Sequence, residues 1–183
     1  MNVNQGHQIF VVTERLLLRE IIPEDVDDFF EMDKEPAVHQ YLGNKPVKRK
    51  EQMAEVIEFV RNQYVENGIG RWAVVEKESN KFIGWAGLKL VKETLNNHQH
   101  YYDLGYRLNS NYWGRGYASE AARASLQYGF ETMKLKEIFA AAHVDNIASN
   151  RILSGLGFVL QNTFYYEEEL NNWYSIQGLR EQI

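Results

Sequence analysis

The chain has 183 residues, 44% of them hydrophobic, which fits one globular domain with a single core. Its net charge is −5, and the basic residues are dispersed except in the run 45–50, which argues against nucleic acid as a direct partner. The chain has no cysteine, which excludes disulfides, thiolate metal sites and cysteine nucleophiles and is compatible with a reducing cytosol.

The N-terminal residues 1–8 are polar and have no apolar leader core, and no later run approaches the roughly 18 apolar residues of a membrane span. We therefore expect one cytoplasmic domain over residues 1–183, a monomer or homodimer without membrane contact. Residues 1–8 are expected to be flexible.

The first third of the chain predicts a strand and two helices. The run from Thr13 to Glu20 suits a first strand. Pro23 and the acidic residues after it predict the start of a helix, which ends near Lys34 because Pro36 disfavours helical geometry just before it. A second helix follows Pro46, with an apolar stripe at steps of three and four, and ends before Gly68.

The middle third predicts a hairpin and a loop. Residues 72–75 and 82–91 read as two strands joined by a polar turn, and Gly84 and Gly87 are typical of a bulge. The polar stretch 93–100 reads as a loop. Its His98 and His100 could bind a metal, but no third ligand is near them in the sequence, so we expect two solvated histidines and no metal site.

The last third alternates strands and helices. Strands are predicted at 101–108 and 136–144, and helices at 116–133 and from about residue 147 to a cap at Gly157. Strands over Phe158–Tyr166 and Trp173–Ile176 complete the chain, with two polar stretches between them. This order predicts an α+β, three-layer α/β/α domain: a mixed sheet with helices on both faces.

The stretch from Asn109 to Glu120 lies where a strand meets a helix. The first N–H groups of a helix have no intrahelical partner, so a glycine turn leading into one can accept a phosphate group. The run contains neither the Gly-Lys-Ser/Thr of a Walker loop nor the third glycine of a dinucleotide fold. A plain tight turn is the other interpretation of the two glycines alone.

Other motifs in the sequence resemble those of a known protein family. The run 113–121 (WGRGYASEA) resembles the coenzyme A pyrophosphate loop of the GNAT superfamily of N-acetyltransferases, in particular its RimJ/RimL-type branch. Residues 146–151 (NIASNR) with 156–158 (LGF) resemble the second motif of that family. Residues 13–16 (TERL) and 103–106 (DLGY) resemble its first-strand and fourth-strand signatures. The resemblance covers nearly the whole chain.

The resemblance implies a sheet whose central parallel strands, 101–108 and 136–144, part to admit acetyl-CoA. The pantetheine arm would then bind backbone groups of the parted strand, as an added strand does. The pyrophosphate would lie on N–H groups of the glycine loop, with Arg115 supplying charge. The expected cofactor contacts are Leu108, Asn109, Trp113, Gly114, Arg115, Gly116, Tyr117, Ala118, Ser119, Asn146, Ser149 and Asn150. Arg115 could instead be a solvent-facing arginine, Asn146 a helix cap, Asn150 a surface residue and Ser149 a serine of the first helical turn.

The resemblance also implies an acetyl transfer from the cofactor to a primary amine. Many family members have a tyrosine acid at the position of Leu153, so that acid is absent here, and Ser149 matches a serine with this role in RimL-like members. For the base, Asp103 matches an acidic position on the fourth strand and Glu168 a RimL-like glutamate. Asp103 could instead be paired with a neighbouring strand, and Glu168 could belong to a solvated turn.

Three classes of function remain open at this point, the third being a nucleotide phosphate-binding protein. The first is an N-acetyltransferase whose acceptor is a protein N-terminal α-amine or a small-molecule amine. The second is a non-catalytic acyl-CoA-binding sensor or interaction module, because the tyrosine acid is missing.

Overall fold

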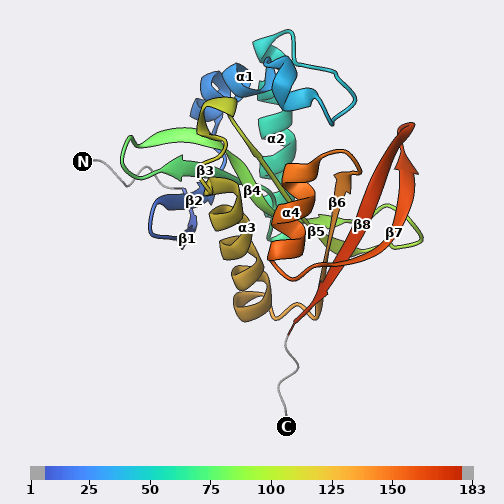
Figure 1. Ribbon diagram of the computed structural model, residues 1–183. Coiled ribbons are helices and arrows are strands. Elements are labelled where there is room, and N and C mark those ends of the chain that lie inside the picture. Colours follow the sequence, from blue (N-terminus) through green and yellow to red (C-terminus); the bar gives the residue numbers. More distant parts are fainter. Residues whose placement is uncertain (1–6, 179–183) are drawn as a thin grey trace.

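The computed structural model describes residues 7–178, which form one eight-stranded mixed sheet and four α-helices (Figure 1). Most of the N-terminal segment expected to be flexible lies outside this range. The strands are β1 (Ile9–Val12), β2 (Leu16–Glu20), β3 (Trp72–Glu76), β4 (Lys81–Val91), β5 (Tyr101–Leu108), β6 (Glu137–His143), β7 (Val159–Tyr166) and β8 (Glu169–Gln177). The helices are α1 (Val26–Asp33), α2 (Lys50–Asn67), α3 (Tyr117–Gln127) and α4 (Ile147–Gly155).

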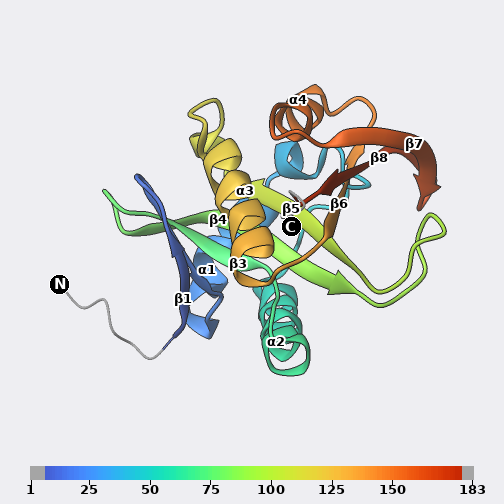
Figure 2. The same ribbon diagram turned by 90° about the horizontal axis from the view of Figure 1, so that it is seen from below.

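The sheet has helices on both faces, as predicted. Helices α3 and α4 lie on one face, and α1 and α2 lie on the other (Figures 1 and 2). Each face has its own core: Leu104, Ala121 and Leu153 belong to the α3/α4 side, and Phe29, Ile57 and Phe82 to the α1/α2 side. None of the described helices is long and apolar enough to cross a membrane.

The strand order is β1-β2-β3-β4-β5-β6-β8-β7, and β5 and β6 are its parallel neighbours. Strand β5 pairs with β4 along its whole length, but with β6 it shares a single register pair, Asp103 with Phe139. Beyond that pair the two strands separate. The predicted parting of the central strands is therefore present, and it opens toward the carboxyl ends of both strands.

The N-terminal half differs from the predictions mainly by one strand. Strand β1 was not predicted, because it is short and only partly buried; it packs through Phe10, which stacks on Trp72 with ring centroids 4.7 Å apart. The other predicted elements of this half are present in the structure. Helix α1 ends at Asp33, and α2 ends where Gly68 adopts a left-handed φ of 69°. The predicted bulge interrupts the β3–β4 pairing beside Gly84.

The C-terminal hairpin is longer than predicted. Only Glu167 and Glu168 form its turn, both with positive φ, and β8 begins at Glu169. Polar residues predicted to be in a loop, Asn171 and Asn172, therefore lie in the strand, where Asn172 donates from Nδ2 to Asn150 Oδ1 at 2.9 Å. Two-residue turns with positive φ suit the twist of a hairpin, and this one leaves no room for the longer loop.

The expectation of two solvated histidines is wrong for His98. Its ring lies 4.7 Å from that of Phe139 and 5.3 Å from that of Trp173, as part of an aromatic cluster under the β4–β5 loop. His100 is exposed, as expected. The sequence around residue 98 is polar, and the stacking partners come from distant strands, so local pattern could not reveal them.

A polar clamp attaches the first strands to the start of α3. The Glu120 carboxylate accepts hydrogen bonds from Thr13 Oγ1 at 2.6 Å, from the Arg15 amide at 3.0 Å and from Arg15 Nε at 2.7 Å. Arg15 Nη1 also donates to the Arg115 carbonyl at 2.9 Å. Burial opposes ionisation of Glu120, but these donors outweigh it and lower the pKa of the carboxyl. The clamp therefore fixes the loop before α3 against the rest of the sheet.

We expect Glu120→Ala to lower the free energy of unfolding by about 1–3 kcal/mol, because it removes several hydrogen bonds to one carboxylate. Chemical denaturation measures this loss. Glu51→Ala, which removes an exposed first-turn acid from α2, is the matched control and should have little effect.

The pH dependence of the Glu120 contribution follows from its lowered pKa. The contribution is complete above the ordinary glutamate pKa of 4.5 and is lost as the pH falls through the lower folded value. The stability difference between the parent and Glu120→Ala should therefore shrink in acid. A difference that stays constant down to the acid-unfolding range would contradict the assigned clamp.

Candidate active site

The start of α3 presents a row of backbone donors at the opening between β5 and β6. Gly116, with φ of 80°, is the residue before the helix, and the Glu120 amide donates to the Gly116 carbonyl at 3.0 Å. The amides of Tyr117, Ala118 and Ser119 precede that first intrahelical bond, so they have no partner within the helix. A side chain at Gly114 would meet open space, as would one at Gly116 apart from Arg15 Nη2 at 3.5 Å. This surface can accept an anion closely.

Side chains near this loop are mostly used for structure. Trp113 is half exposed and donates from Nε1 to the Leu108 carbonyl at 2.8 Å. Tyr117 is buried and donates its hydroxyl to Glu76 Oε1 at 2.5 Å. The Arg115 guanidinium lies over the Tyr112 ring, 5.5 Å from its centroid. Among the expected cofactor contacts in this loop, Arg115 therefore has a charged group that remains at the surface.

The end of β5 offers fewer free backbone groups than predicted. The Asn109 amide donates to the Ile83 carbonyl at 2.9 Å, and the Asn109 carbonyl accepts from the Tyr112 amide at 3.0 Å. The Asn109 amide is therefore not free for the predicted contact, and its carbonyl already has one partner. Because alternate residues of a strand direct their amides to opposite sides, Leu108 and Tyr106 direct theirs toward the opening.

A hydroxyl pair links β5 to α4 across the opening. Tyr106 Oη and Ser149 Oγ lie 2.9 Å apart. Burial raises the pKa of Tyr106 to about 12, against the opposing effect of the Ser149 hydrogen bond, so the phenol is protonated at neutral pH. Ser149 lies in the first turn of α4, and its amide donates to Asn146 Oδ1 at 3.1 Å. Asn146 therefore caps α4, which is the alternative role considered for it. It lies beside Ser149, a candidate proton donor.

The Asn150 side chain, an expected cofactor contact, is engaged in hydrogen bonds within the protein. Its Nδ2 donates to the carbonyls of His143, Val144 and Asn146, and its Oδ1 accepts from Asn172 Nδ2 and Tyr174 Oη. An asparagine amide has two hydrogens and two lone pairs, so no capacity is left for a ligand. Asn150 instead fixes α4 to β6 and β8.

Asp103 lies at the point where β5 and β6 part, and it forms an ion pair with Arg71. Arg71 is buried and also donates to the carbonyls of Gly87 and Asp103. A Cβ on Gly105 would lie 2.6 Å from Arg71 Nη2, so glycine is needed there for the arginine to pass over the strand. The Asp103 carboxylate, a candidate base, therefore neutralises the buried Arg71 cation. A structural pairing of this kind is the alternative role considered for Asp103.

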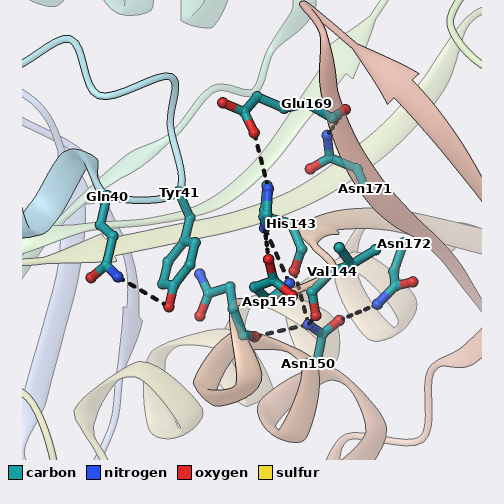
Figure 3. A network of polar contacts seen from close by, with 10 residues as sticks. Gln40, Tyr41, His143, Val144, Asp145, Asn150, Glu169, Asn171 and Asn172 are labelled. Carbon is teal, nitrogen blue, oxygen red and sulfur yellow. Dashed lines mark hydrogen bonds and ion pairs between the residues drawn. The ribbon is translucent and has the colours of Figure 1, made fainter.

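The consecutive glutamates at the β7–β8 turn, residues 167–169, have different surroundings. Glu168 is exposed at the turn itself, whereas Glu169 Oε2 lies 3.0 Å from His143 Nε2 (Figure 3). The Asp145 amide donates to His143 Nδ1 at 3.1 Å, so Nδ1 is unprotonated and Nε2–H donates to Glu169. Glu169, and not Glu168, is attached to the strand that borders the opening.

Tyr41 completes this side of the opening. It comes from the connection between α1 and α2, and its ring lies 5.4 Å from that of His143 (Figure 3). The nearby pair Lys45 and Glu167 also joins this connection to the hairpin, with 3.9 Å between Nζ and Oε2. The α1–α2 connection and the β7–β8 hairpin therefore meet on the face opposite α3 and α4.

Several of these residues were not predicted as site residues. Tyr106 was in a recognised signature, but its partner Ser149 is far away in sequence. The others are single polar residues on strands and loops with no local pattern: Arg71, His143, Tyr41 and Arg107, whose Nη1 lies 2.9 Å from Asp33 Oδ1. The alternation of residues along β5 and β6 would have placed Arg107 and His143 on one face, had the register been known.

The parted parallel strands and the donor-rich helix start define an acyl-CoA-type transferase fold. The chain belongs to the GNAT acetyltransferase family, since its residues 15–159 match the model of the GNAT acetyltransferase domain. Acetyltransferases of this family use acetyl-CoA and act on amines, so this protein is an acyltransferase.

Individual proteins agree with this assignment. An uncharacterised N-acetyltransferase, p20, of Bacillus licheniformis is 31% identical over 80% of each chain. The crystal structure of a GNAT-family acetyltransferase from Bacillus anthracis has a TM-score of 0.75 at 26% identity, covering 91% of this chain and 97% of that one. RimL, the ribosomal L7/L12 α-N-protein acetyltransferase in complex with coenzyme A, shares the fold with a TM-score of 0.78 at 19% identity, covering 93% and 98%.

We expect Asn150→Ala to lower the free energy of unfolding by about 2–4 kcal/mol, because it leaves the buried Tyr174 hydroxyl and several carbonyls without partners. Under conditions where the variant is folded, calorimetry should show coenzyme A affinity close to that of the parent. Asn172→Ala, which breaks one of the same bonds, should cost less. A large loss of affinity at unchanged stability would restore Asn150 as a ligand contact.

Proposed function

We propose that this protein transfers an acetyl group from acetyl-CoA directly to a primary amine. The observation that supports this most is the opening between β5 and β6, which ends at the free amides of α3. An elongated ligand with an anionic end fits such a site: its chain can pair with Leu108 and Tyr106, and its phosphates can lie on the amides of residues 117–119.

Acetyl-CoA supplies the acetyl group as a thioester, which an unprotonated amine can attack. The amides of α3 and the Arg115 guanidinium would bind the phosphates at one end of the opening. Tyr106 and Ser149 lie along it, and their linked hydroxyls can donate a hydrogen bond or a proton to the departing sulfur.

Glu169 is the carboxylate that we assign as proton acceptor. Its side chain is 42% exposed, so water can reach it, and the His143 Nε2–H bond fixes its direction. Asp103 is less suited to this task because its charge compensates the buried Arg71. Since a primary amine attacks only when unprotonated, the rate should rise toward alkaline pH.

The acceptor is either a protein N-terminal α-amine or the amine of a small molecule. The RimL structure favours the first, but at 19% identity it supports the fold and not the substrate. Release of free thiol from acetyl-CoA with a mixed panel of amines tests the activity itself. Binding of coenzyme A without thiol release from any amine would instead support a non-catalytic sensor.

We expect Gly116→Leu to weaken coenzyme A binding at least about 10-fold, or about 1.4 kcal/mol, because its side chain would occupy the phosphate surface. Gly68→Leu is the control. Gly68 has a similar left-handed φ of 69° and open space around it, but it ends α2, away from the opening. Both variants should lose comparable stability, about 1–2 kcal/mol from backbone strain. Equal affinities measured by calorimetry would remove the phosphate site from this loop.

We expect Glu169→Gln to lower kcat by about 10²-fold or more, because an amide cannot accept the amine proton. Glu168→Gln should remain close to the parent, since Glu168 lies in the exposed turn. Steady-state kinetics across pH 6–10, with Asp103→Asn in parallel, distinguish the candidates. If Asp103→Asn abolishes turnover and Glu169→Gln does not, the base lies on β5.

A further inference from the structure

The opening between β5 and β6 has two chemically different sides on the face covered by α1 and α2. Arg107 and His143 each lie four residues beyond the shared pair of Asp103 and Phe139. Because side chains alternate along a strand, both point to the same face as that pair. Arg107 contacts Asp33 of α1, and His143 contacts Tyr41 of the following connection. These two residues therefore face the opening from opposite strands.

Arg107 has unused hydrogen-bonding capacity. Its Nη1 donates to both oxygens of Asp33, each at 2.9 Å. Among the described residues neither Nε nor Nη2 has a partner, and Nε is buried. A guanidinium presents Nε–H and one Nη2–H as a fork that matches two acceptor oxygens. Since an unpaired buried donor is costly, this edge of Arg107 calls for an acceptor group.

The residues around Arg107 in the part of the chain that the structure describes supply no such acceptor. The Trp85 ring lies beneath the guanidinium, with 5.2 Å from Cζ to the ring centroid. His39 is buried, its Nε2 is also without a partner, and it lies 3.8 Å from Asp33 Oδ1, beyond hydrogen-bonding distance. Burial and the charge of Arg107 lower the pKa of His39 despite Asp33, so the imidazole is uncharged. Arg107 is therefore held in place by Asp33 and Trp85, while its Nε–Nη2 edge has no hydrogen-bond partner among the described residues.

The opposite side of the opening is acidic. Glu169 is bound to His143, and Tyr41 lies against the same imidazole. The two sides are joined by the short segment from His39 to Tyr41, whose Cα atoms are at most about 7 Å apart. The free edge of Arg107 and the Glu169 carboxylate therefore lie on opposite sides of the same opening, connected by this segment.

We propose that the acceptor is an amine with a carbonyl or carboxylate oxygen on the carbon next to it, and that Arg107 binds this oxygen while the amine faces Glu169. Amino acids and peptide N-termini have this arrangement, whereas polyamines and simple alkylamines do not. The inference rests on the proposed acetyl transfer and narrows its substrate class. It makes Arg107 a specificity-determining residue.

The first test compares acceptors that differ only at this group. Phenylalanine, phenylalaninamide and phenethylamine form one series, and lysine, lysinamide and cadaverine form another. Rates are divided by the unprotonated fraction of each amine, because the carbonyl itself lowers the amine pKa. We expect kcat/KM for the carbonyl-bearing members to exceed that of the matched alkylamine at least about 10-fold. Within each series the acid and the amide separate free amino acids from peptide N-termini.

The second test uses Arg107→Lys, which keeps the charge beside Asp33 but removes the fork. The preference for carbonyl-bearing acceptors should fall to less than about 3-fold, mainly through a higher KM for those acceptors. Arg19→Lys is the control: Arg19 forms a buried pair with Asp25, at 2.8 and 2.7 Å, away from the opening. The same exchange there should leave the acceptor preference unchanged.

The outcomes separate this inference from the proposed function. If phenethylamine and cadaverine are acetylated as well as their carbonyl-bearing counterparts, the inference is wrong and the acetyl transfer stands. If the parent shows the preference but Arg107→Lys retains it, Arg107 is not its source. If no amine releases thiol although coenzyme A binds, both proposals fail. Should Arg107→Lys not fold, the comparison of acceptors on the parent protein still decides the substrate class.

Discussion

The single register pair between β5 and β6 is the constraint on which the rest of this structure depends. Two parallel strands that separate after one pair leave backbone groups without ladder partners, and such groups are costly unless something else satisfies them. The protein compensates around the opening: β8 pairs with the whole of β6, β4 pairs with the whole of β5, and Asn150 attaches α4 to the far side. The opening is thus held apart by rigid neighbours on both sides and is not a frayed edge.

The two faces of the opening have separate tasks. On the α3/α4 face are free amides, glycines and hydroxyl groups, which suit a phosphate-bearing ligand. On the α1/α2 face are Arg107, Glu169 and their supports, which suit a small polar acceptor. Asp103 and Arg71 lie where the strands part, and as a neutral pair they close the end of the opening without adding net charge to either side.

The sequence predicted the fold and the glycine turn before α3 well, because both depend on local patterns. Proline and glycine positions marked the ends of α1, α2 and α4, and the two glycines before α3 share a strand-to-helix junction with free amides. The acceptor side could not be predicted in this way. Arg107 binds Asp33 74 residues away, His143 binds Glu169 26 residues away and Asn150 binds Asn172 22 residues away. Contacts at such distances follow from the register of the sheet. The partners that Asn109 and Asn150 have within the protein could not be foreseen for the same reason.

The Glu120 clamp has a consequence for local unfolding. Thr13 and Arg15 lie between the strands of the β1–β2 hairpin at the edge of the sheet, yet they share one carboxylate with the helix that we propose binds the cofactor. A ligand that binds the amides of α3 stabilises the folded start of this helix, and any opening of the hairpin that breaks the clamp must oppose that binding. Hydrogen exchange in the first strands is thereby linked to occupancy of a site that they do not touch.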